Sequence, residues 1–168
     1  MNKVKIYSFS DLMPIIMAVI EEGDCFPLAV KGNSMYPFLR EGKDKVVFSS
    51  LKGRTIKRGD IILFQRKNCQ YIVHRVYKIE NDNTLTLVGD NQVLLEKGIK
   101  LDQVKAYVGS VVRNGREIDC EQGIIRWLMT VYMIIRVHNP VLFRKLVKLV
   151  TLFRSQKHIS FPSDKINR

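Results

Sequence analysis

The chain has 168 residues and a formal net charge of +12, from 28 Lys and Arg side chains against 16 Asp and Glu. Its 46% hydrophobic and 26% charged residues are typical of a globular protein and exclude a disordered or collagen-like chain. The positive charge is concentrated at one end, because residues 124–168 hold 9 basic and 1 acidic side chains. We therefore expect that segment to meet an anionic partner, either nucleic acid or a membrane surface.

Residues 1–25 are predicted to form an N-terminal helical segment, with a helix over residues 10–22 that ends before Gly23. The apolar run within it, residues 15–20, is too short to span a bilayer, and no signal-peptide pattern accompanies it. These features predict a cytoplasmic or peripheral membrane-associated protein. The face expected to pack on the body consists of Leu12, Ile15, Ile16, Val19 and Ile20.

Residues 26–120 are predicted to form a β domain. Short runs rich in Val, Ile, Phe and Tyr alternate with Gly, Asn and Asp clusters, which is typical of strands joined by tight turns. The absence of intervening helical patterns favours a mainly β body, a small coiled antiparallel or mixed sheet of barrel-like shape. The predicted strands are residues 26–31, 45–48, 60–65, 70–80, 84–89 and 106–113.

Residues 121–153 are predicted to be a basic helical appendage, followed by a polar tail over residues 154–168. Its first helix, residues 124–137, is apolar almost all round, and its second, residues 141–153, is amphipathic with cations on one side. Residues 124–153 could bind an anionic membrane surface, or fold over the body with their charges in water. Nucleic-acid binding is disfavoured, because no helix-turn-helix or RNA-reading signature is present.

Three cysteines, Cys25, Cys69 and Cys120, lie far apart in the chain and form no C-x-x-C pair. Their odd number and wide spacing disfavour a disulfide framework or a zinc site and favour reduced thiols. We expect neither a metal nor a cofactor.

Three short segments carry residues suited to nucleophilic catalysis. Ser34 lies in a turn over residues 32–37, His74 lies within an alternating strand, and Asp90 follows a strand in a Gly-Asp-Asn sequence. A serine attacks when a histidine takes its proton, and an acid orients that histidine. Each segment alone also fits a bland interpretation: an ordinary turn, a half-buried strand histidine and a hairpin turn.

Taken together, the order and spacing of these segments resemble the type I signal peptidase family, over residues 26–113. The likeness is closest to the endoplasmic-reticulum and archaeal branch, in which a His replaces the Lys base. The self-cleaving repressor peptidases share the same S24/S26-type fold and pair Ser with Lys. The motifs that carry the resemblance are Ser34-Met35-Tyr36-Pro37, Gly59-Asp60, Val73-His74-Arg75-Val76, Gly89-Asp90-Asn91 and Val108-Gly109-Ser110.

This resemblance implies a serine endopeptidase with Ser34 as nucleophile, His74 as general base and Asp90 as the acid. Glu96 stands where the family often has a second acid, and it is the fallback for the third role. The implied reaction is cleavage of a leader or precursor peptide after small residues. The alternative is a non-catalytic membrane-surface or partner-binding module that retains the peptidase fold.

Two departures from the family pattern are visible in the sequence. No membrane-spanning helix precedes the serine motif, which puts general secretory signal peptidase activity in question. The acid that usually follows the glycine after the serine turn is displaced by one residue, to Gly42-Lys43-Asp44.

Overall fold

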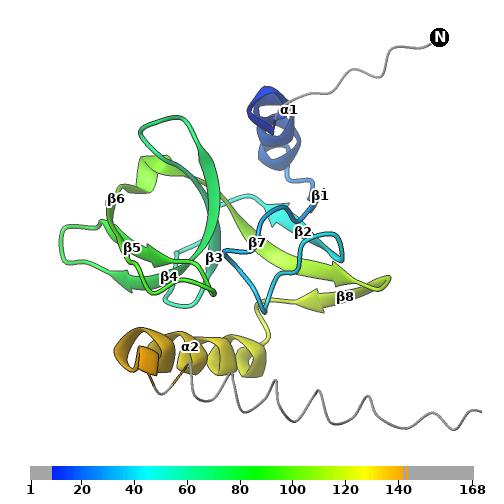
Figure 1. Cartoon of the computed structure of the whole chain (residues 1–168). Coiled ribbons are helices and arrows are strands. Elements are labelled where there is room, and N and C mark those ends of the chain that lie inside the picture. The colour runs from blue at the N-terminus through cyan, green and yellow to red at the C-terminus, as the bar shows by residue number, and fades with distance from the viewer. Residues whose placement is uncertain (1–8, 142, 144–168) are drawn as a thin grey trace, which may run out of the picture.

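The computed structural model describes residues 9–141 and residue 143, and it consists of an antiparallel β-sheet with a helix on either side (Figure 1). The helices are α1, Phe9–Glu21, and α2, Gly123–His138, with a short 3-10 helix, η1, at Leu101–Gln103. The strands are β1 (Phe26–Ala29), β2 (Asp44–Ser49), β3 (Ile61–Gln65), β4 (Tyr71–Ile79), β5 (Leu85–Val88), β6 (Glu96–Ile99), β7 (Val104–Arg113) and β8 (Arg116–Asp119).

The predicted mainly β body is confirmed, although the sheet is open rather than closed into a barrel. Its strand order is β1-β2-β7-β3-β4-β5-β6, with β8 paired to β7, and all of the pairings are antiparallel. All six predicted strands are present. The sequence did not predict β6 and β8, because their mostly polar residues lack the alternation of a half-buried strand. Asn114 and Gly115 both have positive φ and form the tight turn between β7 and β8.

Helix α1 packs on the sheet through a face that shares Leu12, Ile16 and Ile20 with the predicted one. Met13, Ile16 and Ile20 are buried, whereas Ile15 is 61% exposed. The buried residues recur at intervals of three and four, which places them on one face of the helix. The predicted face includes Ile15 and leaves out Met13, so it is rotated around the helix axis by part of a turn from the face that packs. Both residues are apolar enough to fit either face.

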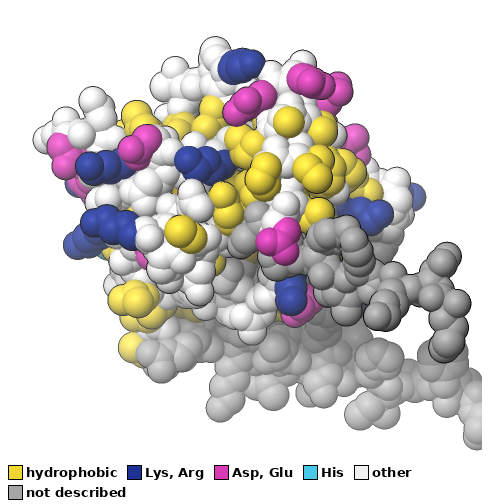
Figure 2. Space-filling view, turned by 90° about the horizontal axis from the view of Figure 1, so that it is seen from above, with side chains coloured by type: hydrophobic (Ala, Val, Ile, Leu, Met, Phe, Trp, Pro, Cys, Tyr) yellow, Lys and Arg dark blue, Asp and Glu magenta, His cyan; other side chains and the backbone are white. Residues whose placement is uncertain are grey.

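The central strand β3 has hydrophobic core on both of its faces. Ile61 and Leu63 pack in the cluster that also holds α1, whereas Ile62 and Phe64 pack in a second cluster with β5 and β7 residues. This double burial explains why β3 reads as a continuous apolar run. Seen from the α1 side, hydrophobic side chains gather in one area of the surface between scattered charged residues (Figure 2).

The first C-terminal helix is α2, which exceeds the predicted range by one residue at each end. Pro140, Val141 and Phe143 are also helical, as expected for the start of the second predicted helix, and the rest of residues 141–153 lies outside the described residues. No helix of the described part of the chain is both long and apolar enough to cross a membrane.

Candidate active site

Ser34 lies in the loop between β1 and β2, in a turn that its neighbours anchor to the core. The Tyr36 amide donates to the Asn33 carbonyl at 3.1 Å, and the Leu39 amide donates to the Met35 carbonyl at 2.8 Å. Met35 and Leu39 are buried in the cluster beneath α1. The loop is therefore anchored to the core next to Ser34, which is half-buried.

The far end of the Ser34 loop is closed by Asp44, the displaced acid of the sequence. Its side chain is fully buried; it accepts two hydrogen bonds from the Arg113 guanidinium, at 2.9 and 2.7 Å, and one from the Arg40 amide at 2.8 Å. These bonds, with that of Arg113 leading, lower the pKa of Asp44 to about 2. Arg113 also donates to the Phe38 carbonyl at 2.5 Å, so one ion pair fixes the loop to β7.

His74 lies in the middle of β4 and is almost completely buried, at 1% exposure. As the alternation predicts, it shares a face with Ile72 and Val76, and its ring packs against Phe64 with centroids 5.9 Å apart. Burial is the main cause that lowers the pKa of His74 to about 4. The imidazole is thus neutral at physiological pH, which is the state a general base requires.

Glu96, on β6, is the acid that contacts His74. Its Oε1 lies 3.0 Å from Nδ1 of His74, at ion-pair distance although not aligned as a hydrogen bond. The Arg66 guanidinium holds the same carboxylate in a fork, with Nε 2.8 Å and NH2 2.5 Å from its two oxygens. Burial raises the pKa of Glu96, but the Arg66 hydrogen bonds and the neighbouring charges outweigh it and leave that pKa below its usual value.

Asp90 makes a different contact from the one the sequence favours for it. Both of its oxygens accept hydrogen bonds from Arg75, at 2.8 and 2.7 Å, and its side chain is fully buried. Arg75 also donates to the Gly59 carbonyl, and Tyr132 of α2 donates to the Asp90 carbonyl. The structure therefore puts the fallback residue, Glu96, at Nδ1 of His74 and puts Asp90 in a buried ion pair that joins β4 to two turns.

Gly89 shows how closely the serine turn and His74 approach each other. A Cβ at this position would lie 2.6 Å from the Ser34 carbonyl oxygen and 3.0 Å from Nε2 of His74. The Asn91 amide donates to the same Ser34 carbonyl at 2.7 Å. Nε2 therefore faces the Ser34 turn while Nδ1 faces Glu96, and only glycine leaves room for this approach.

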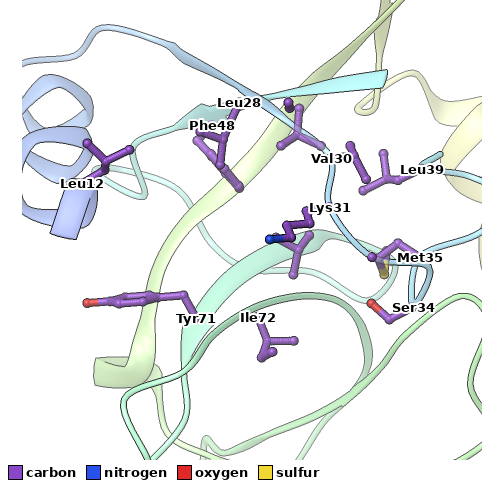
Figure 3. A pocket seen from close by; sticks show the side chains of 14 residues that line it. Leu12, Leu28, Val30, Lys31, Ser34, Met35, Leu39, Phe48, Tyr71 and Ile72 are labelled. Atoms are coloured by element: carbon purple, nitrogen blue, oxygen red, sulfur yellow. The ribbon is translucent and has the colours of Figure 1, made fainter. Parts of the chain in front are cut away.

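A pocket of about 500 Å³ opens beside Ser34 (Figure 3). Ser34 lines it, and Lys31 is the charged side chain among the lining residues. Most of the others are aliphatic or aromatic, and they come from α1, β1, β2, β4 and the Ser34 loop. They include Leu12, Leu28, Val30, Leu39, Phe48, Tyr71 and Ile72.

A family model described as Peptidase S24-like matches residues 3–112. The chain belongs to the Peptidase S24-like family. The match covers about two thirds of the chain, from before α1 to near the end of β7, and so includes Ser34, His74, Asp90 and Glu96. Comparison with curated proteins finds no match.

Membership in the S24-like family supports a peptidase-like fold of the serine type, which is coarser than the signal peptidase resemblance of its sequence. Strand β8 and helix α2 lie outside the matched range. The signal-peptidase role and the pairing of Ser34 with a histidine go beyond this match.

Several residues that shape the S24-like site carry no recognisable signal in the sequence. Arg66 is 30 residues from Glu96, and the two meet in the folded chain although β4 and β5 lie between β3 and β6 in the sheet. Arg113 is 69 residues from Asp44. Gly89 is the exception, because a glycine before the Asp-Asn pair already hints at a close backbone approach.

Proposed function

We propose that this chain is a serine endopeptidase in which Ser34 is the nucleophile and His74 the general base. Glu96, gripped by Arg66, takes the third role and orients the imidazole. The observation that carries the proposal is the convergence at Gly89, where Nε2 of His74 and the Ser34 turn meet beside an apolar pocket. Family membership supports the reaction class.

In this mechanism Ser34 Oγ attacks the carbonyl carbon of a peptide bond while Nε2 of His74 takes the hydroxyl proton. His74 then gives that proton to the leaving amine as the C–N bond breaks, which leaves an acyl-enzyme. A water molecule attacks the ester while His74 accepts its proton, and His74 passes that proton to Ser34 Oγ as the ester C–O bond breaks, which releases the acid and restores both side chains. Glu96 stabilises the imidazolium formed in each half of the cycle.

The pocket favours an extended peptide as substrate. Strand β1 pairs with β2 alone among the described strands, and Ile72 and Val73 of β4 pair with β3 alone. Both segments line the pocket, so a peptide strand between them would add main-chain hydrogen bonds. The apolar walls favour aliphatic side chains, and the volume exceeds the needs of one small residue.

We further propose that the natural substrate is a leader or precursor peptide, as in signal peptidases. The support is the resemblance of the Ser34, His74 and Gly89-Asp90-Asn91 motifs, in that order along the chain.

The test is cleavage of a panel of precursor peptides by the wild type, Ser34→Ala and His74→Ala. Both substitutions are expected to reduce turnover by at least about a thousandfold. Ser50→Ala and His138→Ala are the matched controls, since neither residue lines the pocket or is among those that converge at Gly89, and both are expected to retain activity. Cleavage at the wild-type rate by Ser34→Ala and His74→Ala would remove both residues from the mechanism, and no cleavage by the wild type would indicate a non-catalytic binding module.

A further inference from the structure

Helix α2 presents its apolar side to water and its charges to the protein. Met133 and Arg136 are buried against the body, and Arg126 lies 3.5 Å from Asp60. The opposite side carries an outer stripe at intervals of three and four residues. The outer stripe consists of Ile124, Trp127, Leu128, Val131 and Ile135, of which Ile124 is 77%, Trp127 63% and Leu128 53% exposed.

The inner side of α2 is fixed, so the outer stripe cannot be buried by a simple rotation of the helix. Thr130 lies so close to Gly59 that a Cβ there would meet its hydroxyl at 2.6 Å. Tyr132 donates to the Asp90 carbonyl at 3.2 Å. A continuous exposed stripe of large apolar side chains on a helix held in this way indicates an interaction surface.

The charge of the sequence around α2 indicates the kind of surface that the outer stripe binds. Arg126 and Arg136 face the body, yet the sequence from residue 139 to the end still holds 7 basic residues and 1 acidic one. Apolar side chains with a tryptophan, followed directly by a cationic sequence, are typical of a segment that lies on anionic lipid. Helix α2 has 16 residues, too few to span a bilayer.

We infer that the outer stripe of α2 docks on an anionic membrane surface, with the helix axis in the plane of the interface. Helix α1 lies on the opposite side of the β body and then faces away from the lipid (Figure 1). This inference is independent of the peptidase proposal, because no residue of the outer stripe lines the pocket beside Ser34 or is among those that converge at Gly89.

The chain contains a single tryptophan, Trp127, and it lies in the outer stripe, so its fluorescence reports docking directly. The full chain is mixed with phosphatidylcholine vesicles with and without phosphatidylserine. We expect a blue shift of Trp127 emission and flotation with the phosphatidylserine vesicles, and neither with phosphatidylcholine alone. Flotation without a blue shift would show that the cationic sequence binds by itself and would overturn the inference.

Leu128→Glu places a charge in the outer stripe and keeps the reporter. It is expected to weaken partition into anionic vesicles by at least about tenfold. Leu101→Glu is the matched control, because Leu101 is 50% exposed on η1, and it should partition as the wild type does. Equal loss in both variants would overturn the inference. So would a lipid-free, concentration-dependent dimer that shields Trp127, since the stripe would then bind a second copy.

Discussion

One cation, Arg66, acts on His74 both through the acid beside it and through its own charge. Glu96 raises the pKa of the imidazole, whereas burial and the Arg66 charge lower it, and burial is the largest of these effects. Arg66 thus positions Glu96 and at the same time opposes the effect of Glu96 on the pKa of His74. A histidine whose pKa lies this far below 7 stays neutral, and so able to act as a base, at lower pH than an ordinary histidine does.

The pH profile of peptide cleavage follows from this tuning. Neutral His74 is the reactive form, and its pKa is about 4 rather than 6.5, so activity should fall only as pH drops towards 4. We expect kcat/KM to be nearly constant between about pH 6 and 8. Circular dichroism at each pH checks that the fold persists. An acid limb centred near 6.5 would show that His74 is solvated or is not the base.

Removing the Arg66 charge should move this profile in a defined direction. In Arg66→Gln the carboxylate of Glu96 loses its fork and faces His74 uncompensated, so the pKa of His74 rises towards 6.5. The acid limb of kcat/KM therefore shifts to higher pH, and kcat falls because Glu96 is no longer held. Arg116→Gln on exposed β8 is the control. A pH profile of kcat/KM identical to that of the wild type would show that Arg66 does not act on His74.

Gly89 gives a steric test of the convergence. In Gly89→Ala the new methyl group meets the Ser34 carbonyl, a backbone atom, so the serine turn must shift away from His74. We expect the unfolding free energy to fall by about 1–3 kcal/mol. We also expect kcat to fall by more than it does in other variants that lose the same unfolding free energy. Gly123→Ala, where a Cβ meets nothing within 4 Å, should be neutral in both measurements. Full activity in Gly89→Ala would contradict the placement of His74.

At the scale of elements, the Ser34 loop depends on its two ends. Met35 and Leu39 secure the start in the core, and the Asp44–Arg113 pair secures the return to β2 and β7. The pKa of Asp44 is about 2 in the folded chain against 3.8 without its partners. Its contribution to stability is therefore complete above about pH 4 and is lost as pH falls through 2.

Asp44→Asn should loosen this loop. The buried carboxylate loses its charge while Arg113 keeps its own, and because Arg113 is partly exposed we expect a cost of about 2–3 kcal/mol in urea unfolding at pH 7. Asp102→Asn, at an exposed position on η1, is the control. Equal stability of the two variants would show that the ion pair does not hold the loop.

The elements also show how far the sequence predicts this fold. Alternation found the six strands with a half-buried or buried pattern, and the Ser34, His74 and Gly89 motifs were visible because each depends on local residue order. The Arg66–Glu96 fork depends on strand order, which no local pattern encodes. Asp90 and Glu96 are equally acidic in sequence, and only the register of β5 and β6 puts Glu96 beside His74.

For the whole molecule, most of the +12 net charge and the candidate active site lie in different parts of the chain. The candidate site lies within the family-matched residues, whereas most of the net charge lies beyond residue 123. Helix α2 connects the two parts, because Tyr132 contacts the Asp90 carbonyl and Thr130 packs on Gly59. The sequence shows α2 as apolar nearly all round, and only packing reveals that its arginines turn inward.

The central claim is that Ser34 is a nucleophile activated by His74. The most direct measurement is intact mass after treatment with a serine-directed fluorophosphonate, followed by mapping of the modified peptide. We predict one adduct, on Ser34, in the wild type, and its loss in Ser34→Ala and His74→Ala at neutral pH. No adduct on Ser34 in the folded wild type, or equal labelling in His74→Ala, would contradict this account.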